Sequence, residues 1–159
     1  MLPRGVMSAR LGRMSGELRP GGMTLQLPVG DIEAGRRFYA TLFGRGPDFT
    51  PHDDFLEWRV LPGVELWWQV VGMDGPFPPL TARVRLQVDD VRAAARRVAS
   101  ELGVVASPVT TLPGVVSFIN FEDPWGNQLG YYEDIVPSQE QHGPGGSAHD
   151  ERLFDVESA

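Results

Sequence analysis

Hydrophobic and polar residues follow the same pattern in two stretches of the chain, residues 25–44 and residues 84–103. Each stretch opens with alternating apolar and polar residues, which is typical of a half-buried strand, and continues with apolar residues at helical spacing. An acidic residue that can cap a helix stands between the two patterns, and a glycine that can end a helix closes each stretch. The stretches match at a constant offset of 59 positions, as at Val29 and Val88. We therefore predict that one strand–helix unit occurs twice in the fold.

The residues after each unit predict three further extended segments. They are an irregular segment around 49–54 and strands over 55–60 and 64–71 in the first half, and strands over 106–111, 115–121 and 128–133 in the second half. The last two strands flank Asp123-Pro-Trp-Gly-Asn127, a sequence that indicates a hairpin turn. Both halves are thus predicted to run strand, helix, strand, strand, strand.

The ends of the chain and its middle differ in composition from these two halves. Residues 1–22 combine arginines and glycines without a sustained period, and residues 137–159 are acidic and rich in glycine and serine near Gly143–Ser147. Prolines in residues 73–80 disfavour a helix or a central strand. We therefore predict a disordered leader (1–22), a first module (23–72), a Pro/Gly linker (73–80), a second module (81–136) and an acidic flexible tail (137–159).

Composition excludes several classes of function. The 159 residues include no cysteine, which excludes disulfides, thiolate metal sites and cysteine nucleophiles. The net charge of −7 argues against nucleic acid as a partner, because binding to phosphates needs a basic surface. No apolar run approaches the roughly 20 residues that cross a bilayer, and no secretory signal is apparent. We expect a cytoplasmic protein without a nucleic-acid or membrane partner.

Several motifs resemble those of the vicinal oxygen chelate superfamily, which contains glyoxalase I, extradiol dioxygenases and bleomycin-resistance proteins. They are Val29-Gly-Asp31, Phe38-Tyr39, Leu42-Phe-Gly44, Val88-Asp89-Asp90 and Phe121-x-Asp-Pro-x-Gly-Asn-x-Leu129. The resemblance covers residues 23–134. It implies an α+β fold in which two tandem βαβββ modules form a curved mixed sheet around a cavity, with the helices outside. Because relatives complete their cavities across a two-fold axis, it also implies a homodimer.

The resemblance also bears on metal binding. Metal-dependent members of the superfamily hold the ion at four cavity positions. By the resemblance, these positions correspond to Thr24, Glu65, Arg83 and Gly130. Only Glu65 is a suitable ligand, because arginine has no lone pair to donate, glycine has no side chain and a threonine hydroxyl binds transition metals poorly. The chain therefore resembles metal-free glyoxalase-like or bleomycin-resistance-like members most closely, and we expect neither a metal nor another cofactor.

Strand alternation and the resemblance together place the candidate ligand-binding residues on the cavity side: Gln26, Trp58, Glu65, Trp67, Gln69, Arg83, Arg85, Phe118 and Tyr132. A guanidinium such as that of Arg83 binds carboxylates well, so Arg83 pairs either with the carboxylate of Glu65 or with that of an anionic ligand. Large rings such as Trp67 suit an aromatic guest, although core packing is the alternative for each.

These residues predict a domain that binds a small, partly aromatic, anionic molecule without a metal. One alternative is a glyoxalase-like lyase or isomerase with Glu65 as catalytic base and Arg83 as electrostatic stabiliser. A second is a metal-dependent member with an atypical ligand set, and a third is a regulatory module with a vestigial cavity. Whether the protein is an enzyme stays open at this point.

Overall fold

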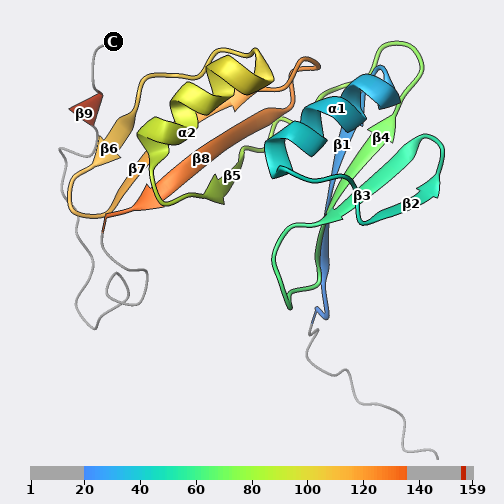
Figure 1. Ribbon diagram of the computed structural model, residues 1–159, viewed down its shortest axis with the longest axis horizontal. Helices are drawn as coiled ribbons and strands as arrows, with labels where there is room; N and C mark the ends of the chain where they lie inside the picture. The colour runs from blue at the N-terminus through green and yellow to red at the C-terminus, as the bar shows by residue number, and fades with distance from the viewer. Residues whose placement is uncertain (1–19, 136–154, 157–159) are drawn as a thin grey trace, which may run out of the picture.

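The computed structural model describes residues 20–135 and 155–156 of the chain. The first module contains β1 (Met23–Val29), α1 (Ile32–Phe43), β2 (Phe49–His52), β3 (Phe55–Arg59) and β4 (Leu66–Gly72). The second contains β5 (Val84–Gln87), α2 (Val91–Arg97), the π-helical turn η1 (Val98–Leu102), β6 (Thr110–Leu112), β7 (Val116–Glu122), β8 (Gln128–Asp134) and β9 (Asp155–Val156). The predicted α+β fold with two repeated modules is confirmed (Figure 1). Residues 73–80, predicted as a linker, carry no helix or strand.

The two sheets share one topology. Their strand orders are β1-β4-β3-β2 and β5-β8-β7-β6-β9. The first strand of each module pairs in parallel with the last strand of the repeat, and the remaining neighbours are antiparallel. The helices lie on one side of the sheets (Figure 1). No described helix therefore lies on the opposite side of either sheet, which we call the open face.

Both helices begin and end as the sequence pattern predicts. The Asp31 carboxylate accepts a hydrogen bond from the Ala34 backbone N–H at 3.0 Å, and Asp90 caps the second helix in the same way at 2.8 Å. The helical segments end at Gly44 and Gly103, whose φ values of 69° and 68° lie in the left-handed region. Glycine is favoured there because it has no Cβ to clash.

The core of the first module lies between α1 and its sheet. Trp58 is 0% exposed, lies opposite Trp68 in the sheet and donates from Nε1 to the Arg45 carbonyl at 3.1 Å. Tyr39 packs against both indoles. The prediction that Trp58 lines the cavity is therefore wrong. Since Trp58 alternates in phase with Leu56, it belongs to the helix-facing row.

The Asp-Pro-Trp-Gly-Asn turn joins the two modules. Asp123 is 4% exposed and accepts a hydrogen bond at 2.6 Å from the hydroxyl of Tyr39 in α1. Asn127 donates to Asp123 at 2.7 Å and to the Pro28 carbonyl of β1 at 2.8 Å, and it accepts from the Leu80 backbone N–H at 2.8 Å. We call Tyr39, Asp123 and Asn127 the junction network. It satisfies buried polar groups from both modules and so fixes their relative position.

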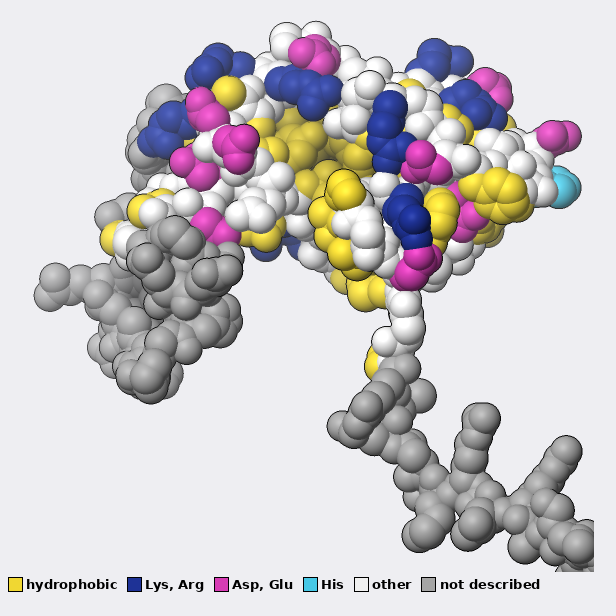
Figure 2. All heavy atoms as spheres, turned by 60° about the horizontal axis from the view of Figure 1, so that its bottom comes forward, with side chains coloured by type: hydrophobic (Ala, Val, Ile, Leu, Met, Phe, Trp, Pro, Cys, Tyr) yellow, Lys and Arg dark blue, Asp and Glu magenta, His cyan; other side chains and the backbone are white. Residues whose placement is uncertain are grey.

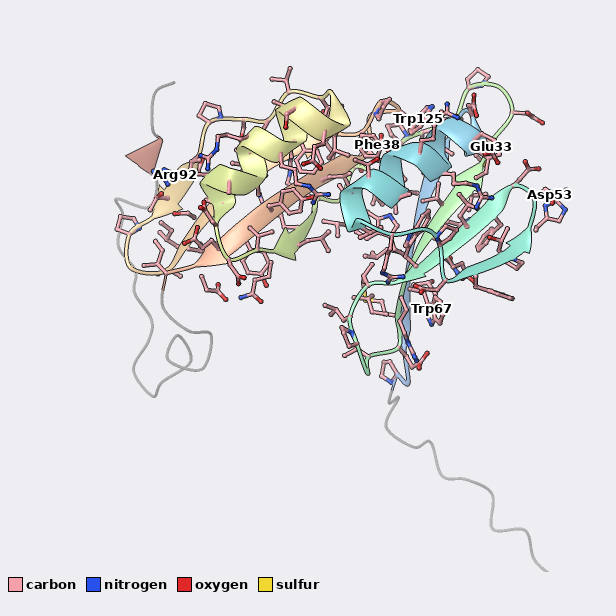
Figure 3. All side chains as sticks on the ribbon, viewed as in Figure 1. Glu33, Phe38, Asp53, Trp67, Arg92 and Trp125 are labelled. Atoms are coloured by element: carbon pink, nitrogen blue, oxygen red, sulfur yellow. The ribbon has the colours of Figure 1, made fainter. Side chains whose placement is uncertain are left out.

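A second set of bonds joins the helical segments. The Arg97 guanidinium donates to the backbone carbonyls of Thr41 and Leu42 at the end of α1. The last turn of α1 has no basic residue of its own, so Arg97 supplies the positive charge that favours a helix C-terminus. Phe38 and Trp125, labelled in Figure 3, meet edge to face at 6.5 Å nearby. Among the described helices, none is both long enough and apolar enough to span a membrane.

Candidate functional site

Two arginines dominate the open face of the second sheet. Alternation along β5, β7 and β8 puts Ile119, Leu129 and Tyr131 in the core. The opposite face therefore carries Arg83, Arg85, Gln87, Phe118, Asn120, Glu122, Gln128, Gly130 and Tyr132. Of the predicted site residues, Arg83, Arg85, Phe118 and Tyr132 are thus brought together on one surface.

Arg85 takes the space left by the missing side chain of Gly130. A Cβ on Gly130 would lie 2.9 Å from Arg85 Cγ and 2.5 Å from the Ile119 carbonyl oxygen. The guanidinium of Arg85 donates from Nε and Nη2 to Asn120 Oδ1 at 3.1 and 2.8 Å, and its Cζ lies 4.5 Å from the centre of the Phe118 ring. Burial and then the positive charge of Arg83 lower the pKa of Arg85. The glycine thus permits a guanidinium to lie across the sheet.

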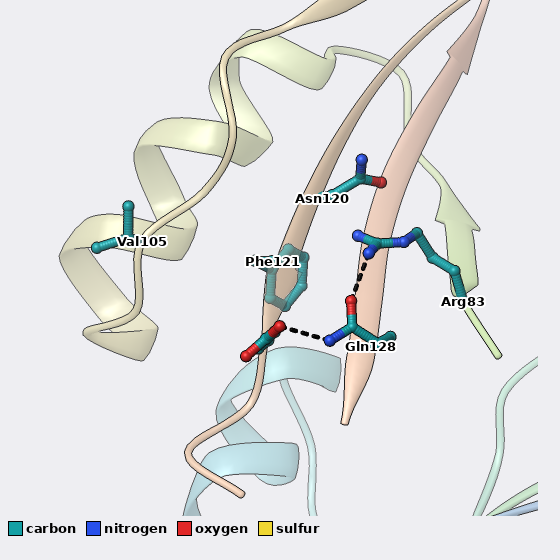
Figure 4. A pocket seen from close by; sticks show the side chains of 6 residues that line it. Arg83, Val105, Asn120, Phe121 and Gln128 are labelled. Carbon is teal, nitrogen blue, oxygen red and sulfur yellow. Dashed lines mark hydrogen bonds between the residues drawn. The ribbon is translucent and has the colours of Figure 1, made fainter. Parts of the chain in front are cut away.

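Arg83 lies at the edge of a pocket of about 370 Å³ (Figure 4). The pocket is lined by Arg83, Val105, Asn120, Phe121, Glu122 and Gln128. Arg83 Nη2 donates to Gln128 Oε1, and the amide nitrogen of Gln128 donates in turn to Glu122. The hydrogen-bond partners of both arginines among the described residues are therefore neutral amides, and Gln128 links Arg83 to the carboxylate of Glu122.

The open face of the first sheet carries Gln26, Glu65, Trp67 and Gln69 near its first and last strands. Glu65 forms an ion pair with Arg59 and accepts a hydrogen bond from Trp67 Nε1 at 3.2 Å. The Arg59 guanidinium also lies over the Trp67 ring, with Cζ 5.5 Å from its centre (Trp67 is labelled in Figure 3). Gln69 donates to Glu57 at 2.6 Å.

These contacts correct the proposed pairing of Glu65 with Arg83. Within one chain Glu65 is paired with Arg59, and Arg83 with Gln128. Sequence reasoning missed Arg59 although it stands directly opposite Trp67 in the sheet. Alternation from Phe55 along β3 places Arg59 on the open face, so the signal was present. The sequence does not show which residues of β3 and β4 lie opposite each other, so it does not show that Arg59 is next to Trp67.

The strand register also corrects one of the four residues that the resemblance placed at the metal-ligand positions of the superfamily. Arg85 stands opposite Gly130 in the second module, and Gln26, the repeat equivalent of Arg85, stands opposite Gln69. The equivalent of Gly130 in the first module is therefore Gln69 rather than Glu65. Within residues 20–135, no group of three or more His, Cys, Asp or Glu side chains is arranged to hold a metal ion. The four metal-ligand positions then hold Thr24, Gln69, Arg83 and Gly130. This set of side chains does not fit a metal ion either.

A smaller pocket lies where the two modules meet. Its volume is about 180 Å³, and it is lined by Leu25, Val60, Leu61, Leu66, Trp68, Val84, Arg85, Leu86, Gln87 and Tyr132. Figure 2 shows hydrophobic side chains in a hollow between the modules. Trp68 Nε1 is buried and has no hydrogen-bond acceptor among the described residues. Arg85 and Tyr132 thus border both an apolar pocket and the charged open face.

Comparisons with solved structures identify proteins of the same fold. A glyoxalase/bleomycin-resistance protein from Catenulispora acidiphila is 29% identical, with 73% of this chain and 98% of that chain covered and a TM-score of 0.56. An antibiotic-binding protein from a Streptomyces species is 24% identical, with 75% and 99% covered and a TM-score of 0.57. A glyoxalase-related enzyme from Fulvimarina pelagi is 17% identical, with 75% and 91% covered and a TM-score of 0.59. No protein-family model and no curated protein matches the chain.

Proposed function

Because the chain shares its fold with glyoxalase/bleomycin-resistance proteins, we propose that it binds a small, partly aromatic, anionic molecule without a metal, on the open face of its second sheet. The observation that carries this proposal is the placement of Arg83 and Arg85 on one face, with neutral amides as partners. Two neighbouring guanidinium groups repel each other, and an anion between them relieves that repulsion.

The geometry of Arg85 favours a carboxylate or a similar planar anion. Its Nε and Nη2 are held by Asn120, and its plane is supported by the Phe118 ring, so the guanidinium is oriented before any ligand arrives. Nη1 of Arg85 carries no hydrogen bond to a described residue, and Arg83 bonds through Nη2 alone. Charge-assisted bonds to such preoriented groups are stronger than bonds between neutral partners.

The volumes of the two pockets indicate the size of the ligand. Small-molecule pockets commonly measure roughly 300–1,000 Å³. The pocket beside Arg83, at about 370 Å³, lies at the lower end of this range, whereas the apolar pocket beside Arg85, at about 180 Å³, has room for only part of a ligand. We infer a molecule whose anionic group contacts the arginines and whose ring lies toward the apolar side chains at the module junction.

Binding is better supported than catalysis through Glu65. The lyase or isomerase alternative assigned Glu65 and Arg83 to one catalytic pair, and within one chain these residues have different partners.

We also propose that the protein works as a homodimer. The open face of the first sheet carries Glu57 and the ion pair of Glu65 with Arg59, and that of the second carries Arg83, Arg85 and Glu122, so each face offers both charges to a second copy. A two-fold axis brings unlike faces of two copies together twice, which is the self-complementary arrangement that such symmetry requires. Sedimentation velocity at tens of micromolar should give a dimer, and a monomer at that concentration would contradict this proposal.

Titration of benzoate, with benzyl alcohol as the neutral control, tests the site. Benzoate should change the tryptophan fluorescence and bind more tightly than benzyl alcohol. Arg85→Met and Arg83→Met should each weaken benzoate binding by roughly 12- to 150-fold, since a hydrogen bond to a charged group contributes about 1.5–3 kcal/mol. Arg36→Met, on the outer surface of α1, is the matched control and should bind benzoate as the native chain does. Unchanged affinity in both site variants would overturn the proposal.

A further inference from the structure

The edge of the second sheet is covered by a segment from the far end of the chain. The strand β9 pairs antiparallel with β6, with Val156 opposite Thr110 and Asp155 opposite Thr111. β9 thereby becomes the fifth strand of this sheet (Figure 1). In the first sheet the corresponding edge strand is β2, and no described strand covers it.

The two edge strands differ in how well they can accept a further strand. β2 contains Pro51, and its pairing with β3 is irregular between Phe49 and His52. Proline and a register irregularity both discourage edge-to-edge pairing. In contrast, β6 is Thr-Thr-Leu, has no internal proline and pairs with β7 in regular register. β6 is therefore the edge that needs an occupant.

The segment that connects β8 to β9 is much longer than the distance between these two strands requires. β8 ends at Asp134, and the sheet order places β9 three strands away, which corresponds to about 14 Å at the usual spacing of about 4.8 Å. The intervening residues 136–154 can span up to roughly 60 Å when extended. Chain length therefore does not force β9 against β6, and the pairing depends on the interactions between the two strands themselves.

We propose that the β6 edge is a binding site for an extended peptide, and that its occupant is the C-terminal segment of the same chain around Asp155–Val156. Backbone hydrogen bonds are the main source of affinity when a strand is added to a sheet edge. The C-terminal strand thus protects a sheet edge that would otherwise associate with other chains.

Hydrogen exchange of the full-length protein tests this proposal. In Val156→Pro the backbone at that position loses its N–H and its freedom of φ, so pairing with β6 is lost. Exchange of the amides over residues 109–112 should accelerate by about tenfold or more, because a lost edge pairing leaves them open to local exchange. The amides of β7 and β8 are the internal control and should keep their rates, which shows that the module is still folded.

A second variant and an added peptide distinguish the possible outcomes. Ala148→Pro, in the connecting residues, should leave exchange at 109–112 unchanged. A synthetic peptide of residues 150–159, added to Val156→Pro, should restore protection, whereas a scrambled peptide should not. Equal exchange at 109–112 in the native protein and in Val156→Pro would overturn the proposal, as would an equal acceleration in Ala148→Pro.

Discussion

Replacing Tyr39 with phenylalanine removes one hydroxyl from the junction network and leaves the ring in place. The lost bond is the 2.6 Å contact with the Asp123 carboxylate, which is buried and lies between the two modules. Asp123 keeps its bonds from Asn127 and from the backbone N–H groups of Trp125 and Asn127. The carboxylate is therefore left short of one donor rather than stripped of all of them.

The expected cost follows from this arrangement. Hydrogen bonds to charged groups contribute about 1.5–3 kcal/mol, and the burial of Asp123 keeps water from replacing the lost donor. We therefore expect Tyr39→Phe to lower the free energy of unfolding by about 2–3 kcal/mol. That is a large part of the roughly 5–15 kcal/mol typical of a folded domain.

Urea denaturation followed by tryptophan fluorescence measures this change. Tyr131→Phe is the matched control, because Tyr131 is also a buried tyrosine and its hydroxyl makes no hydrogen bond to a described residue. This control should change the free energy of unfolding by less than about 0.5 kcal/mol. A loss below about 0.5 kcal/mol in Tyr39→Phe, or equal losses in both variants, would refute the reasoning that the junction network stabilises the fold.

Three other outcomes are expected. Burial, and next the negative charge of Asp123, raise the pKa of Tyr39 well above its usual value, so the folded protein keeps this phenol protonated while the unfolded chain ionises it near pH 10. Its contribution to stability is complete below about pH 10 and falls as the pH rises further, and the stability of Tyr39→Phe should depend less on pH in that range. Gly130→Ala should destabilise the protein by about 1–3 kcal/mol and weaken benzoate binding, because the new methyl group overlaps a backbone oxygen and the stem of Arg85; calorimetry measures both effects. Arg97→Met should cost about 1–3 kcal/mol in urea denaturation through its lost bonds to the end of α1, whereas the exposed Arg96→Met should be neutral within about 0.5 kcal/mol.

Much of the fold follows from local chemistry that is visible in the sequence. Asp31 and Asp90 cap helices because a short acidic side chain reaches the free N–H groups of the first turn, and Gly44 and Gly103 end helices because they tolerate positive φ. Such signals involve neighbours in the chain, so they need no knowledge of the tertiary structure. The repeat strengthens the predicted helix boundaries, because each of these capping signals occurs twice in the sequence.

The site was harder to predict because it depends on register between distant strands. Alternation put Arg83, Arg85 and Trp67 on the open faces of their sheets, but it does not say which residue lies opposite which. The partner of Glu65 proved to be Arg59, and Arg85 proved to lie over Gly130. Each of these contacts joins different strands. The amide of Asn120 that orients Arg85 has no distinctive sequence signal.

The junction network has a consequence for how the two modules relate as units. The hydroxyl of Tyr39 and the backbone carbonyl of Pro28 belong to the first module. The carboxylate of Asp123 and the amide of Asn127, with which they form hydrogen bonds, belong to the second. A second module produced alone would keep this carboxylate in its turn without the phenol that completes its bonding. The two halves share a sequence pattern, but we expect that neither folds alone and that both unfold in a single cooperative transition. We therefore expect the two copies of the repeat to behave as one domain.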